Sequence, residues 1–199
     1  MGTTAAYAED DNLEDLTFSQ MLKSVDLSKE QKAAELIRKF QDLEARQKLM
    51  NGPLSPKQGK CNIEAFRKKE VILITIPASE LFAPNSSDLS DSASKYLTPI
   101  KRYMKDSDMF RVLLVMHTDN TGSAKYRDNI TADRVDAVTA WFEEQGADTS
   151  YTFSYAFGDE SPLLPNTSIE NRDKNRRLEV YLMPGKKMLE EAKKGKIDF

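Results

Sequence analysis

Cysteine and histidine are nearly absent from this sequence. Among its 199 residues, Cys61 is the one cysteine and His117 the one histidine. A lone cysteine excludes an intrachain disulfide bond and a cysteine-based metal site. His117 and Asp119 could supply two metal ligands, but a zinc site needs three or four. The sequence also lacks GxSxG and glycine-rich phosphate-binding motifs, so we expect no enzyme activity, metal or cofactor.

Long apolar runs and an excess of basic charge are missing too. No stretch approaches about eighteen apolar residues, so we expect no membrane-spanning helix. The net charge is −3 and the basic residues are scattered, which argues against nucleic acid as a partner. The first ten residues, MGTTAAYAED, lack the basic and apolar segments of a secretory signal.

Composition shifts divide the chain into five parts. Residues 1–16 are small, acidic and aperiodic, and we expect a disordered tail. A helical extension is expected over 17–50. A linker follows over 51–60, where two prolines and two glycines in NGPLSPKQGK break the helix. We expect the main domain over 61–184 and a short, charged helix with a solvated face over 185–199.

The extension contains one predicted helix. Ser28 is a suitable N-cap, and the helix should run to residue 50. Its apolar side chains recur at three- and four-residue spacing: Ala33, Leu36, Phe40, Leu43 and Met50. This face could pack on the main domain, or it could pair with a second copy or an envelope protein. Packing is favoured because the repeat is short for a coiled coil.

Strand-like and helical segments alternate in the main domain. Runs rich in β-branched and aromatic residues predict strands at 71–77, 111–118, 151–157 and 178–184. Helices are expected at 89–104, 128–146 and 169–177. Pro99 should kink or restart the first of these helices. The order β-α-β-α-β-(α)-β predicts an α/β (α+β) two-layer sandwich, a four-stranded sheet with helices on one face.

The helix expected over 128–146 carries an arginine on its apolar face. Arg134 falls on the stripe that contains Ile130 and Val138. A buried guanidinium is costly unless an acceptor meets it. Asp119 follows the second predicted strand, so both side chains should point into one crevice. They could form a structural ion pair, or they could be held apart to bind a molecule with both an ammonium and a carboxylate group.

Three short motifs follow one another at characteristic distances. HTDNTG occupies 117–122, TADR occupies 131–134 and NRRLE occupies 175–179, with FGDESP between the last two. In this order they resemble the OmpA-like peptidoglycan-binding domain family, found in OmpA proteins, Pal lipoproteins and MotB stator proteins. The resemblance covers about 71–182. It implies a β-α-β-α-β-β-type sandwich that binds the diaminopimelate of the peptidoglycan stem peptide without covalent chemistry.

The resemblance also implies roles for five residues. Asp119 would accept the ligand's ammonium group, and Arg134 would hold its carboxylate in a bidentate grip. Asn85, Thr121 and Arg176 match positions that supply further polar contacts. A structural role remains the alternative for each of these three: a turn cap for Asn85, a bond within its own loop for Thr121, and pairing with Glu179 or a helix end for Arg176.

Three positions depart from the family pattern, and one of them is Asn171, which replaces a glycine before the last motif. Met116 stands where the family usually has glycine, and Arg127 stands where it has asparagine. Either side chain could crowd the ligand pocket. The function that the resemblance implies is anchoring of the outer membrane or an envelope complex to the cell wall, in the periplasm. The alternative is an OmpA-like protein-interaction module that has lost peptidoglycan binding.

Overall fold

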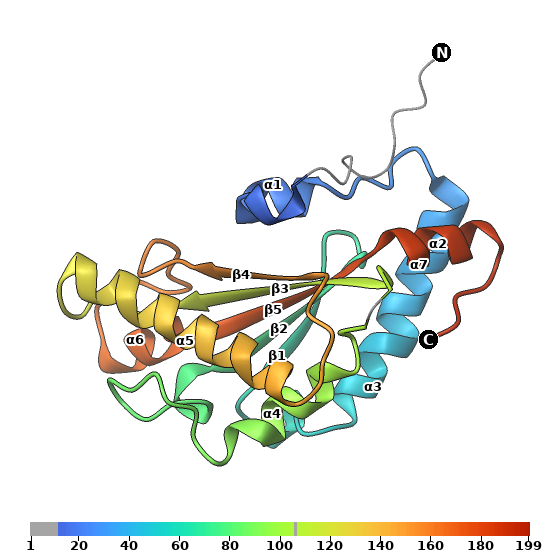
Figure 1. Cartoon of the computed structure of the whole chain (residues 1–199). Coiled ribbons are helices and arrows are strands. Elements are labelled where there is room, and N and C mark those ends of the chain that lie inside the picture. The colour runs from blue at the N-terminus through green and yellow to red at the C-terminus, as the bar shows by residue number, and fades with distance from the viewer. Residues whose placement is uncertain (1–11, 106) are drawn as a thin grey trace.

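One sheet forms the centre of the molecule (Figure 1). The computed structural model describes residues 12–105 and 107–199. Within them, five strands are hydrogen-bonded in the order β1-β2-β5-β3-β4. Their bounds are β1 Asn62–Phe66, β2 Val71–Pro77, β3 Phe110–His117, β4 Thr152–Ala156 and β5 Arg177–Pro184. Only β3 and β4 are parallel neighbours; the other pairs of adjacent strands are antiparallel.

The predicted α/β sandwich is confirmed, but the predicted strand count of four is wrong. The additional strand is β1, which pairs with β2 from Asn62↔Thr75 to Phe66↔Val71. Of its five residues only Ile63 is buried. An edge strand with one buried side chain has no alternating apolar pattern, so periodicity could not reveal it.

The helix after β3 covers one face of the sheet. This helix, α5, spans Ala124–Glu144 and packs on β3 and β4. It begins at Ala124, so the predicted start at Asp128 or Asn129 is wrong. The reason is Ser123, whose hydroxyl accepts the backbone N–H of Tyr126 at 3.1 Å and caps the helix earlier.

A second helix, α4, spans Ala93–Lys101 and lies beside α5 (Figure 1). Its predicted apolar face is confirmed, since Ala93, Leu97 and Ile100 are buried. Pro99 lies within α4, which continues for two more residues to Lys101. The helix therefore does not restart at the proline.

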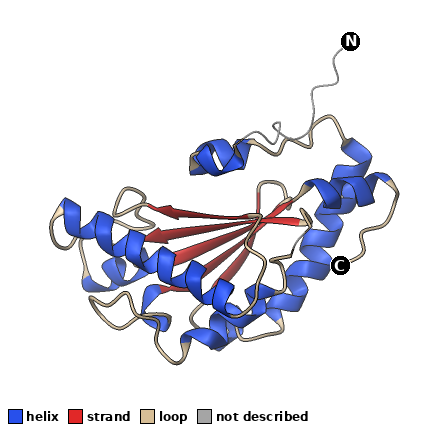
Figure 2. Ribbon diagram, in the orientation of Figure 1, coloured by secondary structure: helices blue, strands red, loops and turns tan. Residues whose placement is uncertain are grey.

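The opposite face of the sheet is covered as well, by helix α1 (Phe18–Lys23). Figure 2 shows this helix on the other side of the strands from α5. The Phe18 ring contacts the rings of Tyr155, Phe157 and Tyr181, with centroids 5.1–5.6 Å apart. The prediction that helices cover one face only is therefore wrong, because a segment before the main domain supplies the second layer.

The predicted helix of the extension is present in three consecutive pieces. These are α2 (Gln31–Lys39), a π-helical segment (Phe40–Ala45) and α3 (Arg46–Met50). The N-cap is Glu30, not Ser28. The π segment adds a residue to one turn and rotates the face that follows, so Leu43 is 63% exposed while Leu49 is buried.

The extension packs against the main domain. The side-chain amide of Gln41 donates to the backbone carbonyls of Glu70 and Leu182, at 3.0 and 3.1 Å. Phe40 lies against Phe110, with ring centroids 6.3 Å apart. The apolar side chains of the extension therefore belong to the same core as those of the sheet and do not form a separate core.

The charged C-terminal segment forms α7 (Lys186–Lys193), which packs beside α2 (Figure 1). The expected solvated face is only part of this helix, because Met188, Leu189 and Ala192 are buried. The remaining helix, α6, spans Ile169–Asn175 and precedes β5. Among the described residues, no helix has the length and hydropathy required to cross a bilayer.

The predicted tail lies mostly outside the described residues, which begin at Asn12. From there, Leu13–Asp15 form a short 3-10 helix, and Leu13 and Leu16 pack against the core. The expected disorder is therefore wrong for residues 12–16. The division of the chain at 51–60 remains a proposal about its folding units.

Candidate functional site

A cleft of about 350 Å³ lies at the end of β3. Four segments form its walls: the loop after β2, the loop after β3, helix α5 and helix α6. All five residues predicted for the site line this one cleft: Asn85, Asp119, Thr121, Arg134 and Arg176. The structure thus brings together residues that lie far apart in the sequence.

Asp119 forms the acidic wall of the cleft. It is 3% exposed, and its Oδ1 accepts the backbone N–H of Thr121 at 2.7 Å. Its Oδ2 accepts a hydrogen bond from Nη1 of Arg176. Burial by itself raises the pKa of Asp119, but the hydrogen bonds from Thr121 and Arg176 outweigh burial and hold this pKa below its usual value. Asp119 is therefore a carboxylate at neutral pH.

Arg134 forms the basic wall and comes from α5. It is 5% exposed, and its guanidinium lies 4.9 Å from the centre of the Phe82 ring. Its Nε donates to the carbonyl of Ser86 at 2.8 Å, and its Nη2 donates to the carbonyl of Ala83 at 3.3 Å. Burial lowers the pKa of Arg134. These carbonyls are the acceptors that a buried guanidinium requires.

These contacts test the structural ion pair that was one of the two interpretations of Asp119 and Arg134. Arg134 bonds to backbone carbonyls, and Asp119 bonds to Thr121 and Arg176, so the direct ion pair is not formed. These bonds also limit which N–H groups of Arg134 are left for the predicted bidentate contact with a carboxylate. Because Nε and one Nη2 hydrogen of Arg134 are already engaged, a ligand carboxylate would be bound through Nη1 and the second Nη2 hydrogen.

A tyrosine and an asparagine form a third wall. Asn85 has φ of 57°, a left-handed conformation that asparagine tolerates, and its Oδ1 accepts the hydroxyl of Tyr126 at 2.8 Å. Gly122 has φ of 83°, and a Cβ there would lie 2.7 Å from Cδ1 of Tyr126. The glycine of HTDNTG is thus needed both for its own conformation and for the position of the Tyr126 ring.

Arg176 follows α6 and reaches two carboxylates. Nη1 donates to Asp119, and Nη2 donates to Oδ1 of Asp173 at 2.9 Å. The alternative pairing of Arg176 with Glu179 is wrong, because Glu179 bonds to the neighbouring Arg177 at 2.8 Å. Asp173 could not be recognised from the sequence, since one acidic residue in a charged segment carries no distinguishing signal.

Other motif residues hold the loops around the cleft. Thr131 is fully buried; its hydroxyl donates to the carbonyl of Arg127 and accepts the backbone N–H of Gly158 at 3.1 Å. The side chain of Asn175 bonds both backbone groups of Leu164, at 3.0 and 2.7 Å. These contacts tie the loop after β4 to α5 and α6, which explains why motif residues outside the cleft matter for its shape.

Met116 and Arg127, which depart from the family pattern, do not line the cleft. Met116 is fully buried in the sheet. Arg127 is held by Asp159, at 2.8 Å from Nε, and by the carbonyl of Gly122. Within residues 12–105 and 107–199, no group of three His, Cys, Asp or Glu side chains could hold a metal ion.

The region around this cleft matches a known family model. Residues 81–176 match the model described as OmpA family. These are 96 of the 199 residues, so the match covers just under half of the chain. The predicted resemblance to this family is therefore confirmed, and the matched region contains β3, β4 and most of the residues that line the cleft.

Two of the similar proteins are named as lipoproteins. The outer-membrane lipoprotein YfiB of Pseudomonas aeruginosa is 30% identical over 102 residues, which are 51% of this chain and 61% of that protein. The chain spans about 60% of the length of the curated lipoproteins it matches. A MotB-like protein from Desulfovibrio vulgaris has a similar structure, with 26% identity and a TM-score of 0.65 over 76% of this chain and 98% of that one.

The cell wall anchor of the T6SS from Pseudomonas aeruginosa also has this fold. Its TM-score is 0.60 at 23% identity, and the match covers 71% of this chain and 97% of the anchor. At this level of identity, the likeness shows the fold. Together these comparisons place the α/β architecture among OmpA-like and MotB-like domains.

Proposed function

We propose that the OmpA-like domain binds peptidoglycan without covalent chemistry, by holding the diaminopimelate of the stem peptide in the cleft. The observation that carries this proposal is the separation of Asp119 from Arg134. Both side chains are buried, they have opposite charges, and each bonds to partners other than its counterpart. A zwitterion presents the complementary pair of charges, an ammonium for Asp119 and a carboxylate for Arg134.

The remaining cleft residues fit the same ligand. Thr121 orients Asp119 through its backbone N–H, and the side chain of Asn85 adds an amide to the wall held by Tyr126. Amide and hydroxyl groups at the rim of a charged pocket fix the orientation of a polar ligand. Arg176, which bonds to Asp119 in the free protein, would lie beside the ligand's ammonium group.

The similar proteins support a role at the cell wall. One similar structure is named as a cell wall anchor, and one relative is named as an outer-membrane lipoprotein. We infer that this chain works in the periplasm, where it ties the outer membrane or an envelope complex to peptidoglycan. Binding rather than catalysis is the activity, and an envelope protein is a further expected partner.

Substitution of Asp119 and Arg134, one at a time, tests the proposal. Asp119→Asn removes the acceptor charge with little change in size, and Arg134→Gln removes the donor charge. We expect each variant to lose most of its retention on purified peptidoglycan sacculi in a sedimentation assay. Calorimetry with free meso-diaminopimelate should show binding to the wild-type chain and none to either variant.

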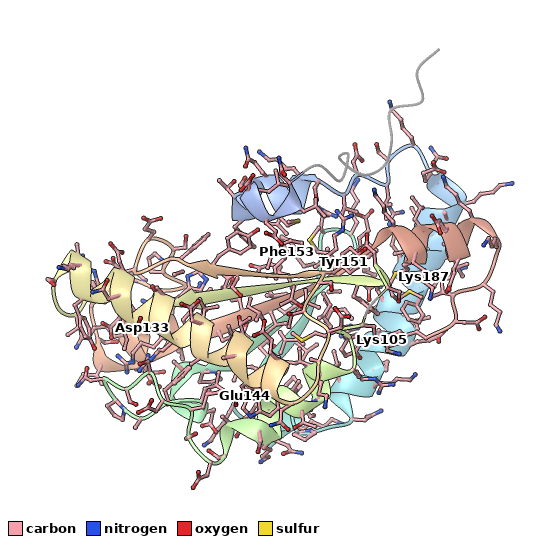
Figure 3. The ribbon with its side chains drawn as sticks, viewed as in Figure 1. Lys105, Asp133, Glu144, Tyr151, Phe153 and Lys187 are labelled. Carbon is pink, nitrogen blue, oxygen red and sulfur yellow. The ribbon has the colours of Figure 1, made fainter. Side chains whose placement is uncertain are left out.

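Asp133→Asn is the matched control, because Asp133 is exposed on α5 next to Arg134 (Figure 3) and does not line the cleft. It should retain wild-type binding. Thermal unfolding distinguishes a lost contact from a lost fold. If the wild-type chain gives no heat with diaminopimelate and does not sediment with sacculi, the proposal is wrong and the protein-interaction module is the better explanation.

A further inference from the structure

Arg176 stands between two carboxylates of different exposure. Its Nη1 donates to Asp119, whose side chain is 5% exposed, and its Nη2 donates to Asp173, whose side chain is 57% exposed. Asp173 precedes Arg176 by three residues on α6 and lines the same cleft. One guanidinium therefore bridges the two carboxylates at the edge of the cleft.

In the free protein, both oxygens of Asp119 are engaged. Oδ1 accepts the backbone N–H of Thr121, and Oδ2 accepts Nη1 of Arg176. An arriving ammonium group must share the Asp119 carboxylate with Arg176 or replace Arg176 there. Two cations on one carboxylate repel each other, so ammonium binding is favoured when the Arg176 charge has another partner.

We propose that Asp173 is this partner, and that it makes the cleft selective for zwitterions over simple anions. When an ammonium group bonds to Asp119, Arg176 shifts its pairing toward Asp173. Asp173 is a positioning residue, since it acts on the ligand through Arg176. This inference rests on the proposed function of the cleft and adds a determinant of its specificity.

The charges of the cleft predict the direction in which loss of the Asp173 carboxylate changes ligand preference. Asp119 and Asp173 balance Arg134 and Arg176, so the cleft is neutral before a zwitterion enters. Without the carboxylate at position 173, Arg176 keeps Asp119 as its only acidic partner, and the cleft carries one excess positive charge. Both changes disfavour an ammonium group, whereas the excess charge favours a ligand with carboxylates alone.

Two probes that differ in the ammonium groups test the proposal. Calorimetry compares free meso-diaminopimelate with pimelate, which has the same carbon chain and carboxylates but no ammonium groups. We expect Asp173→Asn to weaken diaminopimelate binding by about threefold, as for other partly exposed charge pairs, while pimelate binding stays the same or becomes stronger. Asp173→Glu should restore selectivity.

Glu170→Gln is the matched control, because it removes the same charge from the same helix but Glu170 pairs with Lys174 instead of Arg176. It should bind both probes as the wild type does. In an Arg176→Gln background, Asp173→Asn should have no further effect. If wild-type protein binds diaminopimelate and Asp173→Asn behaves like Glu170→Gln, this inference is wrong while the proposed function stands. If wild-type protein binds neither sacculi nor diaminopimelate, the proposed function itself fails.

Discussion

Arg176 and Arg177 are neighbours in the sequence but belong to different groups of side chains. Arg176 bonds to Asp119 and Asp173 in the cleft. Arg177 is 3% exposed and bonds to Glu179 and to the carbonyl of Ser161. A strand sends successive side chains to opposite faces, so the second arginine of NRRLE belongs to the sheet and not to the cleft. The motif therefore combines a residue of the cleft with a residue of the sheet.

Glu179 is the centre of the structural group. It is 7% exposed, its Oε2 accepts the hydroxyl of Tyr181 at 2.7 Å, and Nε2 of His117 lies 3.4 Å away. Burial raises the pKa of Glu179, but His117, Arg177 and Tyr181 lower it further than burial raises it, to about 2. The folded protein thus keeps this carboxylate charged in moderate acid.

This pKa predicts how stability depends on pH. Because the folded-state pKa lies below the ordinary value of 4.5, Glu179 stabilises the fold above about pH 4.5, and this contribution disappears as pH falls toward 2. We expect Glu179→Gln to lower the free energy of unfolding at pH 7 by on the order of 2–3 kcal/mol and to flatten its fall between pH 4.5 and 2. Urea denaturation across this range measures both effects.

Glu144→Gln is the control, since Glu144 is exposed on α5 (Figure 3). Its stability should follow the wild-type pH curve. A Glu179→Gln curve parallel to that of the wild type would show that the carboxylate does not titrate in this way.

At the scale of secondary-structure elements, the six-residue helix α1 stabilises the sheet on which it packs. A helix this short is unstable in isolation, so its structure depends on a capping box at Thr17 and on the contacts of Phe18 with the sheet. The hydroxyl of Tyr155 also donates to the carbonyl of Leu16 at 3.2 Å. Together these contacts cover an aromatic surface of β4 and β5 that would otherwise face water.

Phe18→Ala should therefore destabilise the whole domain. We expect a loss of about 1–3 kcal/mol, because a half-buried aromatic side chain with three ring contacts is removed. Chemical denaturation followed by circular dichroism measures the change. Ser19→Ala, at an exposed position of the same helix, should have little effect. Equal stability of the two variants would mean that α1 contributes nothing to the fold.

At the scale of the whole molecule, the extension and the main domain share one core. Phe40 and Gln41 contact the sheet, and the Tyr103 hydroxyl donates to the carbonyl of Ala45 at 3.2 Å. Removal of the extension would expose apolar side chains at the end of the sheet and leave carbonyls without their partners. The two parts should therefore unfold together.

A fragment of residues 61–199 tests this expectation. We predict that it melts at a lower temperature than the full chain, with a broader transition, in differential scanning calorimetry. The full chain should give one cooperative transition. Two separate transitions in the full chain, or a fragment as stable as the whole, would show that the boundary at 51–60 separates independent folding units.

Much of the site could be predicted because motif spacing places residues on elements. Asp119 follows β3, and Arg134 lies on the buried stripe of α5, so both side chains reach the end of β3. Asp173 could not be predicted, since its role depends on the contact between α6 and the loop after β3. The same limit applies to β1 and α1, whose structure depends on neighbours and not on a strong pattern of their own.

Apolar periodicity predicts the class of fold, and the spacing of three motifs predicts the family and, through that resemblance, the residues that meet in the cleft, because both are local properties of the chain. Which charges pair depends on the three-dimensional arrangement. Asp119 pairs with Arg176, which lies 57 residues away, and not with Arg134, because Arg134 is satisfied by the carbonyls of Ala83 and Ser86. A charge takes the partner that folding brings within hydrogen-bond distance, and spacing along the chain does not specify that distance.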